Sequence, residues 1–300
     1  MPLLSLAGGS MPRLNVPFPT MGGRQFWEDR AFFRGWRIQQ HVLSGHSRLL
    51  DPSDIRRAWG THEDCQKALD QARIEKQLEP MTGTAVIALH GILRSSKSWD
   101  AMRRFLEPDG YQFVAIDYPS TQRTINQFAD QLQSIIESLE GIEKIHFVVH
   151  SMGGLVVRRW CQSYSDPRIG RLVMIGTPNA GAEIATMLRQ NLLFRTIFGP
   201  AGQELIAEPD NFTATLPVPS FEFGVIAGAR GTAEGFNPLI PGDDDGIVTV
   251  NSARLVGATD SFTVRCLHSF QCWNPAAMEA TRRYLQTGAF RESGEREPIT

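Results

Sequence analysis

The 300-residue sequence lacks a long apolar run and carries no marked excess of charge of either sign. Because a membrane-spanning helix needs about 18 or more consecutive apolar residues, the first absence argues against an integral membrane protein. The 30 basic residues nearly balance the 32 acidic ones, so no overall field attracts nucleic acid or an anionic membrane. We therefore expect a small neutral molecule as the partner, and the sequence carries no signal for an oligomeric state.

Cysteine is also scarce, and the four cysteines show no C-x-x-C spacing of zinc or thioredoxin-like motifs: Cys65, Cys161, Cys266 and Cys272. Cys266 and Cys272 are close enough in sequence for a local disulfide, but two buried thiols are the favoured arrangement. Residues 1–13 are apolar without a charged lead or a long hydrophobic core, so they do not resemble a signal peptide. We expect a cytoplasmic protein.

Short apolar runs alternate with helix-like segments beyond Met81. The candidate strands are 85–89, 113–116, 145–149, 172–175, 221–227 and 262–267. The candidate helices are 98–106, 125–139, 153–164 and 274–285, the second with apolar residues every three or four positions. Strands that are apolar throughout are buried on both faces, so the pattern predicts an α/β fold with a mostly parallel central sheet and helices on both faces. Ligands of such sheets bind at the carboxyl ends of the strands.

The pattern predicts one domain over residues 17–287. Within it, residues 17–80 contain two candidate strands, 33–43 and 46–50, joined by a Ser44-Gly45 turn, and a helix over 62–78. We interpret them as an N-terminal β-hairpin that extends the sheet, followed by a helix. Residues 178–220 form a long apolar excursion, which is either a core helix or a cap-like insertion over the ligand site. Residues 1–16 and 288–300 are expected to be flexible.

Ser151 lies between a candidate strand and an apolar helix, in the run His150-Ser151-Met152-Gly153-Gly154. A sharp strand-to-helix turn lifts a serine hydroxyl above the sheet, and the glycines relieve the crowding that side chains would create there. The N-terminus of the following helix favours the negative charge that develops in acyl transfer. An isolated Ser-Gly turn would carry no such meaning, but strand, turn and helix together predict that Ser151 is a nucleophile.

A serine nucleophile on this turn needs a base, which follows it in the chain after an acid. Only one of the seven histidines, His268, lies beyond Ser151, so we predict His268 as the base, with His90 as a weaker candidate. The loop after the first parallel strand can donate an amide to a developing oxyanion. Backbone N–H groups need no rearrangement for this task, and those of Ile92 and Met152 are the natural pair.

Three acids stand together in the segment 241–248: Asp243, Asp244 and Asp245. They suit a solvated acidic loop, a calcium site or the acid of a triad. No glutamate follows at the spacing of a calcium-binding hand, which argues against calcium.

The motifs H-G-I-L at 90–93, H-S-M-G-G at 150–154, I-G-T-P-N-A-G at 175–181, D-G-I-V at 245–248 and L-H-S at 267–269 resemble those of lipases and esterases with the α/β-hydrolase fold. The resemblance covers about residues 82–285. It implies Ser151 as the nucleophile, Ile92 and Met152 as oxyanion donors and Asp245 as the acid. Asp243 and Asp244 are then expected to be solvated.

We therefore expect a carboxylic-ester hydrolase that forms an acyl-enzyme on Ser151, with His268 moving the proton and Asp245 orienting the imidazole. No cofactor and no metal is expected, and the expected substrate is a small-molecule or lipid-like ester. Two alternatives stay open. The same triad can serve an acyltransferase or a thioesterase, and the fold can serve as a binding module without catalysis.

Overall fold

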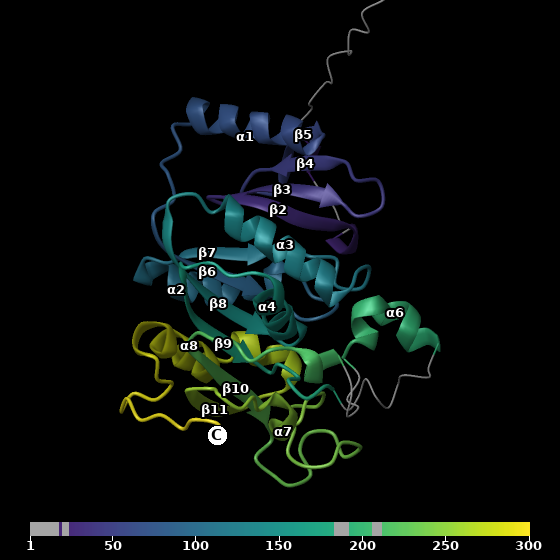
Figure 1. The fold of residues 1–300 in the computed structure, drawn as a ribbon, viewed down its shortest axis with the longest axis vertical. Helices are drawn as coiled ribbons and strands as arrows, with labels where there is room; N and C mark the ends of the chain where they lie inside the picture. Colours follow the sequence, from purple (N-terminus) through teal and green to yellow (C-terminus); the bar gives the residue numbers. More distant parts are fainter. Residues whose placement is uncertain (1–17, 20–23, 183–191, 206–211) are drawn as a thin grey trace, which may run out of the picture.

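The computed structural model describes residues 18–19, 24–182, 192–205 and 212–300, which form two β-sheets with helices packed on them (Figure 1). The central sheet has six strands, all parallel, in the order β11-β10-β9-β8-β6-β7. Its strands are β6 (Gly83–Leu89), β7 (Gln112–Ile116), β8 (Ile142–His150), β9 (Ile169–Ile175), β10 (Phe223–Ala229) and β11 (Asp260–Arg265). The parallel sheet predicted from the apolar runs is confirmed.

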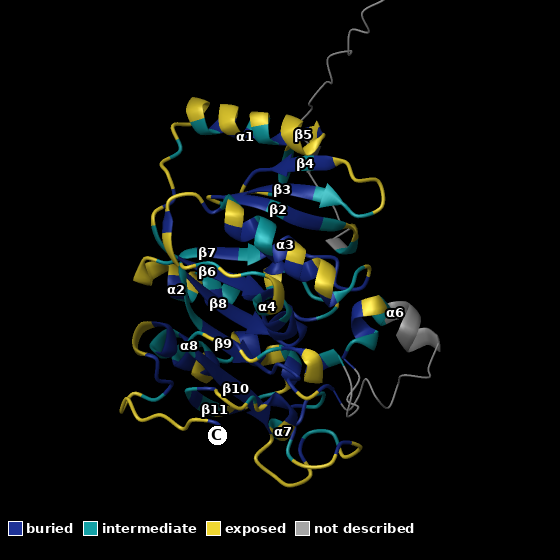
Figure 2. Cartoon of the chain, viewed as in Figure 1, coloured by how far each residue is buried: buried dark blue, intermediate teal, exposed yellow. Residues whose placement is uncertain are grey.

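Strand β6 shows why these runs form a sheet that is covered on both faces. Alternate side chains of a strand point to opposite faces, and here both sets are apolar and fully buried. Ile87 and Leu89 belong to one core cluster, while Val86 and Ala88 belong to a second cluster on the other face. In Figure 2 the central strands are mostly dark blue, and the exposed residues lie on the outer faces of the helices and in the loops.

The helices cover these two faces in pairs. Residues of α3 (Ile125–Ser138) and α4 (Met152–Ser163) complete the first core cluster, and residues of α2 (Asp100–Leu106) and α8 (Pro275–Thr287) complete the second. The ends of the longer helices are capped locally. Thr124 and Gln127 form a capping box at the start of α3, and Asn274 caps α8 ahead of Pro275. Short elements connect the rest: η2 (Ser96–Trp99), η3 (Glu107–Asp109), α7 (Val250–Ala253) and η5 (His268–Trp273).

The carboxyl ends of β6 and β8 lie side by side, because these two strands are neighbours in the sheet. From β6 the chain passes to β7 on one side, and from β8 it passes to β9 on the other. The strand order therefore reverses between them, which is where open α/β sheets leave a crevice for a ligand.

The N-terminal segment differs from the prediction. The predicted hairpin is present as β3 (Trp36–His41) and β4 (Ser47–Leu50), but it lies inside a separate antiparallel sheet of order β1-β5-β4-β3-β2 and does not extend the central one. The other members are β1 (Phe18–Pro19), β2 (Trp27–Phe33), which follows η1 (Arg24–Phe26), and β5 (Ile55–Gly60). Helix α1 (His62–Glu75) packs on this sheet and begins with a capping box at Thr61.

The two sheets meet through buried polar contacts at the end of β7. The amide of Asp29 on β2 donates to the carbonyl of Asp117 at 3.0 Å, and the Asp117 amide donates to the Asp29 carboxylate at 2.6 Å. Gln131 of α3, fully buried, donates to both carbonyls. Arg37 forms an ion pair with Asp117 at 3.1 Å. These contacts replace the continuous ladder that an extended sheet would have.

The chain beyond α8 also differs from the prediction of a flexible tail. Phe290 is fully buried, and its amide donates to Asp260 at 2.7 Å. Ile299 is 3% exposed, and its carbonyl accepts from the Gly257 amide at 2.8 Å. These buried apolar residues, together with Ala289, carry the packing of an otherwise highly charged segment. The predicted flexible segment 1–16 lies outside the described residues.

Candidate active site

Ser151 occupies a strained turn between β8 and α4, with φ 54° and ψ −125°. Positive φ is rare for a residue with a side chain, costs on the order of 1–3 kcal/mol and is concentrated at functional sites. A Cβ on Gly153 would lie 2.6 Å from the carbonyl oxygen of Leu89, and one on Gly154 would collide with the Thr177 side chain. The two glycines of the motif are therefore needed for the turn to pack against β6 and the segment after β9.

Asp245 and His268 come together from the loops that follow β10 and β11. The Nδ1 atom of His268 lies 2.7 Å from Oδ2 of Asp245, and the two residues are 7% and 1% exposed. The backbone amide of His268 also donates to the Asp245 carbonyl at 2.8 Å. An ionised carboxylate only accepts hydrogen bonds, so Nδ1 carries a proton and donates a hydrogen bond to Asp245, which leaves Nε2 on the other side of the ring.

The carboxylate of Asp245 accepts three further hydrogen bonds. Its Oδ1 accepts from the amides of Ile247 at 3.0 Å and Val248 at 2.8 Å. Its Oδ2 accepts from Nε2 of Gln271 at 2.6 Å in addition to His268. Sequence reasoning missed Gln271, because only the 3-10 turn of η5 brings a residue three positions after His268 to the same carboxylate.

His150, directly before Ser151, connects the serine turn to the histidine loop. Its Nε2 lies 3.0 Å from the carbonyl oxygen of His268, to which it donates, and the two imidazole centroids are 4.7 Å apart. Burial holds the pKa of His150 well below its usual range, so its ring is neutral. Among the described side chains no hydrogen bond joins Ser151 Oγ to His268, and the contact through His150 is what brings the two segments together.

The loop after β6 packs directly against Ser151. A Cβ on Gly91 would lie 3.1 Å from the Cβ of Ser151 and 3.5 Å from its Oγ. Met152 is the first residue of α4, so its amide has no acceptor within the helix. In the described loops and helix ends neither this amide nor that of Ile92 donates to a protein acceptor. Both amides therefore keep an unused donor.

His90 shapes this loop. Its ring stacks on Tyr118 with centroids 4.0 Å apart, and its Nδ1 lies 2.8 Å from the Gly91 carbonyl oxygen. It is 1% exposed and held by β6 and the segment after β7. The hydrogen bond to Asp245 is made by His268, not by His90.

The other acids of the loop have structural partners. Asp243 accepts from the amides of Arg230 and Gly231. Asp244 is fully buried and accepts from the Asn237 amide at 3.1 Å, so the expectation that it is solvated is wrong. Where the structure describes the chain, it holds no group of three or more side chains suited to a metal ion.

Two further observations concern the cysteines and the helices. Cys266 and Cys272 are free thiols and form no disulfide. No helix in the described ranges is both long enough and apolar enough to cross a membrane.

The excursion after β9 contains α6 (Leu192–Gln203) and η4 (Phe212–Thr215); residues 183–191 and 206–211 of the predicted cap lie outside the described part of the chain. Helix α6 lies close to the loop after β6, since a Cβ on Gly202 would be 3.6 Å from Cδ1 of Ile92. Arg158 of α4, 3% exposed, donates to the carbonyls of Asn179 and Leu216. Both ends of the excursion are thus fastened to the helix that follows Ser151.

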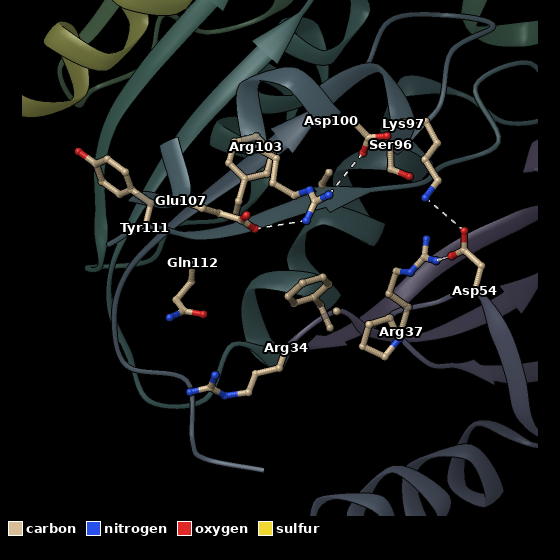
Figure 3. A pocket seen from close by; sticks show the side chains of 15 residues that line it. Arg34, Arg37, Asp54, Ser96, Lys97, Asp100, Arg103, Glu107, Tyr111 and Gln112 are labelled. Carbon is tan, nitrogen blue, oxygen red and sulfur yellow. Dashed lines mark hydrogen bonds and ion pairs between the residues drawn. The ribbon is translucent and has the colours of Figure 1, made fainter. Parts of the chain in front are cut away.

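A separate cavity of about 430 Å³ lies where the N-terminal sheet meets α2 (Figure 3). Four of its charged side chains are paired, Lys97 with Asp54 at 3.3 Å and Arg103 with Glu107 at 3.5 Å. Neither Ser151 nor His268 lines it. The cavity is therefore distinct from the site built on the serine turn.

Comparisons with known proteins point to a known fold. A family model of the alpha/beta hydrolase fold matches residues 84–203. The chain is 27% identical over 150 residues to 2-hydroxy-6-oxononadienedioate/2-hydroxy-6-oxononatrienedioate hydrolase of Comamonas testosteroni, covering 45% of this chain and 52% of that protein. It is 24% identical over 116 residues to lysosomal thioesterase PPT2-B of Xenopus laevis, covering 36% of this chain and 40% of that one. The chain thus spans about half or less of these relatives.

Among solved structures, the mature form of the Bacillus licheniformis lipase BlEst2 aligns with a TM-score of 0.51 and 20% sequence identity. The alignment covers 64% of this chain and 88% of the lipase. At this identity the likeness bears on the fold alone. The family match, the structural likeness and the parallel sheet show that the chain has the α/β-hydrolase fold.

Proposed function

We propose that the protein is a carboxylic-ester hydrolase in which Ser151 forms an acyl-enzyme, His268 is the general base and Asp245 orients it. The observation that carries the proposal is the buried pair of His268 Nδ1 and Asp245 Oδ2 at 2.7 Å, next to a serine held at positive φ. A base oriented by an acid, beside a serine hydroxyl on a strained turn, is the arrangement that acyl transfer requires.

In the proposed reaction, Nε2 of His268 removes the proton of Ser151 as its oxygen attacks the ester carbonyl. The same imidazole then donates that proton to the departing alcohol, and water repeats the sequence in reverse to release the acid. The Ile92 and Met152 amides would donate to the oxyanion of each tetrahedral intermediate, which also lies at the N-terminus of α4. His150 contributes by holding the His268 segment against the serine turn.

The surroundings of Ile92 bear on which alcohol and acyl chain the site accepts. Helix α6 lies near this residue, and the excursion that contains it is fastened at both ends by Arg158. We propose that residues 178–220 form a cap-like insertion over an ester substrate of small-molecule or lipid-like character.

The proposal is tested by reaction with a fluorophosphonate probe and by hydrolysis of p-nitrophenyl esters of graded chain length. The wild type should be labelled and should hydrolyse at least one ester. Ser151→Ala keeps the small side chain that the turn accepts and should lose both properties, with kcat at least about a thousand-fold lower. Unchanged thermal unfolding would show that the variant is folded. A wild type that the probe does not label would instead favour the binding module.

Thioester hydrolysis is the second candidate, since the same groups perform it and a thioesterase is among the relatives. The ratio of kcat/KM for matched acyl thioesters and oxoesters separates the two reactions. A ratio far above that of the uncatalysed reactions would assign the protein to thioesters.

A further inference from the structure

The carboxamide of Gln271 lies in a closed slot behind Asp245. Gln271 is fully buried, and its Nε2 donates to Asp245 Oδ2 at 2.6 Å. A Cβ on Gly176, after β9, would lie 2.8 Å from the carboxamide oxygen, and a Cβ on Gly228 of β10 would collide with its nitrogen. Two glycines at the ends of adjacent strands thus leave the room that this one side chain fills.

Gln271 and His268 reach the same oxygen because they share one turn. Both belong to η5, and side chains three residues apart in a 3-10 helix lie on the same side. Their donor atoms lie 2.6 and 2.7 Å from Oδ2 of Asp245. The other carboxamide atom of Gln271, Oε1, is buried and has no hydrogen-bond partner in the described structure. The side chain therefore makes its one strong contact with the acid.

We propose that Gln271 is a positioning residue of the Ser151–His268–Asp245 site: it holds the Asp245 carboxylate so that one lone pair of Oδ2 is directed at His268. The inference rests on the proposed ester hydrolysis. Gln271 acts through Asp245, and in the described structure its side chain makes no hydrogen bond to the serine turn.

Two measurable effects follow from this geometry. Without the donor, Oδ2 of Asp245 keeps only His268 as its partner, so the imidazole is oriented less tightly and kcat falls while KM is unchanged. The amide dipole also presents its positive end near the imidazole and disfavours imidazolium. Its loss therefore favours protonated His268 and moves the midpoint of the pH–rate profile to higher pH.

Three other groups lie near His268 and bear on the midpoint of the pH–rate profile. These are Asp245, which pairs with it, His150, whose ring is beside it, and Arg94, which donates to the Ser269 carbonyl at 3.4 Å. Burial keeps His150 neutral, and Arg94 keeps its charge across the range, so neither titrates with His268. A shift of the midpoint in a Gln271 variant then reports on the pair of His268 and Asp245.

The experiment measures the rate of fluorophosphonate labelling of Ser151 and the hydrolysis of a p-nitrophenyl ester as functions of pH. In Gln271→Leu we expect kcat to fall about ten- to a hundred-fold, the factor that corresponds to a lost hydrogen bond to a charged group. KM should stay within about two-fold, and the midpoint should rise by roughly half a pH unit, since one unit equals a tenfold change in the equilibrium.

Gln131→Leu is the matched control. Gln131 is also fully buried, donates through Nε2 and has an unpaired Oε1, but its acceptors are the carbonyls of Asp29 and Asp117 at the N-terminal sheet. It should lose stability without a shift of the pH midpoint. Equal midpoint shifts in both variants, or a wild-type profile in Gln271→Leu, would overturn the inference.

Gln271→Glu keeps the side-chain shape and covers the case in which leucine prevents folding. A glutamate can donate to Asp245 only while it is protonated, and two adjacent carboxylates share a proton until the pH is raised. Its labelling rate should therefore fall on the alkaline side, where the wild type stays at its plateau. A plateau in Gln271→Glu would contradict the inference. Failure of the wild type to be labelled would contradict the proposed function instead.

Discussion

Replacement of Asp245 by asparagine changes one atom of the site and leaves its shape intact. The structure decides which way the new amide must face. Oδ1 accepts from the amides of Ile247 and Val248, so the asparagine carbonyl has to occupy that position. Its NH₂ group then points at His268 Nδ1 and at Gln271 Nε2, where the carboxylate had accepted two hydrogen bonds.

The consequence for catalysis follows from the tautomer of the imidazole. An NH₂ group can only donate to Nδ1, which moves the ring proton to Nε2 and removes the base that Ser151 needs. Loss of the correct tautomer in a serine triad costs about 10³- to 10⁴-fold in kcat. The NH₂ group also meets the NH₂ of Gln271. A buried donor without an acceptor costs about 1–3 kcal/mol, so the free energy of unfolding should fall by that amount.

The assay is kcat for a p-nitrophenyl ester, with urea unfolding of the same samples. Asp244→Asn is the matched control, since Asp244 is equally buried in the same loop but, within the described part of the chain, its carboxylate accepts only from the amides of Asn237 and Gly246. An asparagine carbonyl can accept from these amides as well. We expect its kcat to stay within about ten-fold of the wild type, as for Asp243→Asn. A mild Asp245→Asn together with a crippling Asp244→Asn would refute the assignment of the acid.

Two further predictions concern histidines. His268→Ala should abolish ester hydrolysis, whereas His90→Ala should reduce it less because His90 supports the loop of Ile92 through Tyr118; the reverse ranking in kcat would show that the base is misassigned. His146 accepts from the Arg171 amide at 2.7 Å, and burial lowers its pKa from 6.5 to about 4, so the unfolded chain binds a proton that the folded chain does not. The free energy of unfolding should therefore drop by about 2 kcal/mol between about pH 7.5 and 5 on account of this residue, and a His146→Gln variant with an unchanged pH dependence in urea titrations would contradict that reasoning.

The central sheet could be predicted because its strands carry their own signal. A run such as Val86-Ile87-Ala88 is buried on both faces, and no exposed alternate position interrupts it. Strand β2 has no such signal. It reads Trp27-Glu-Asp-Arg-Ala-Phe-Phe33, and its two acids are buried. Charged residues in a strand normally indicate an exposed face. Asp29 is buried because Asp117 and Gln39 supply hydrogen bonds from other elements, and no local pattern indicates such partners.

The residues of the candidate site also fall into those that the sequence indicated and those that it did not. Ser151, Asp245 and His268 could be selected because the order along the chain and the motifs around them limit the choice, and the structure places Asp245 against His268. Gln271 and His150 could not be selected from the sequence. Their contacts arise only where the turn of η5 and the end of β8 lie beside each other, and no local pattern indicates that arrangement.

The strain at Ser151 explains why this residue lies between a strand and a helix, whereas Asp245 and His268 come from loops. A serine at positive φ is unfavourable by itself, so the surrounding structure has to hold it. Here it follows a strand and precedes a helix whose apolar residues are fully buried, among them Val148, Val149 and Leu155. The proposed nucleophile is therefore placed by the part of the chain with the strongest local signal. The proposed base and acid come from loops, which have few such residues and need explicit hydrogen bonds to keep their geometry. Asp245 accepts four of them, two from its own turn and two from η5. A substitution in β8 should thus act through stability first, whereas one in η5 should act through kcat first.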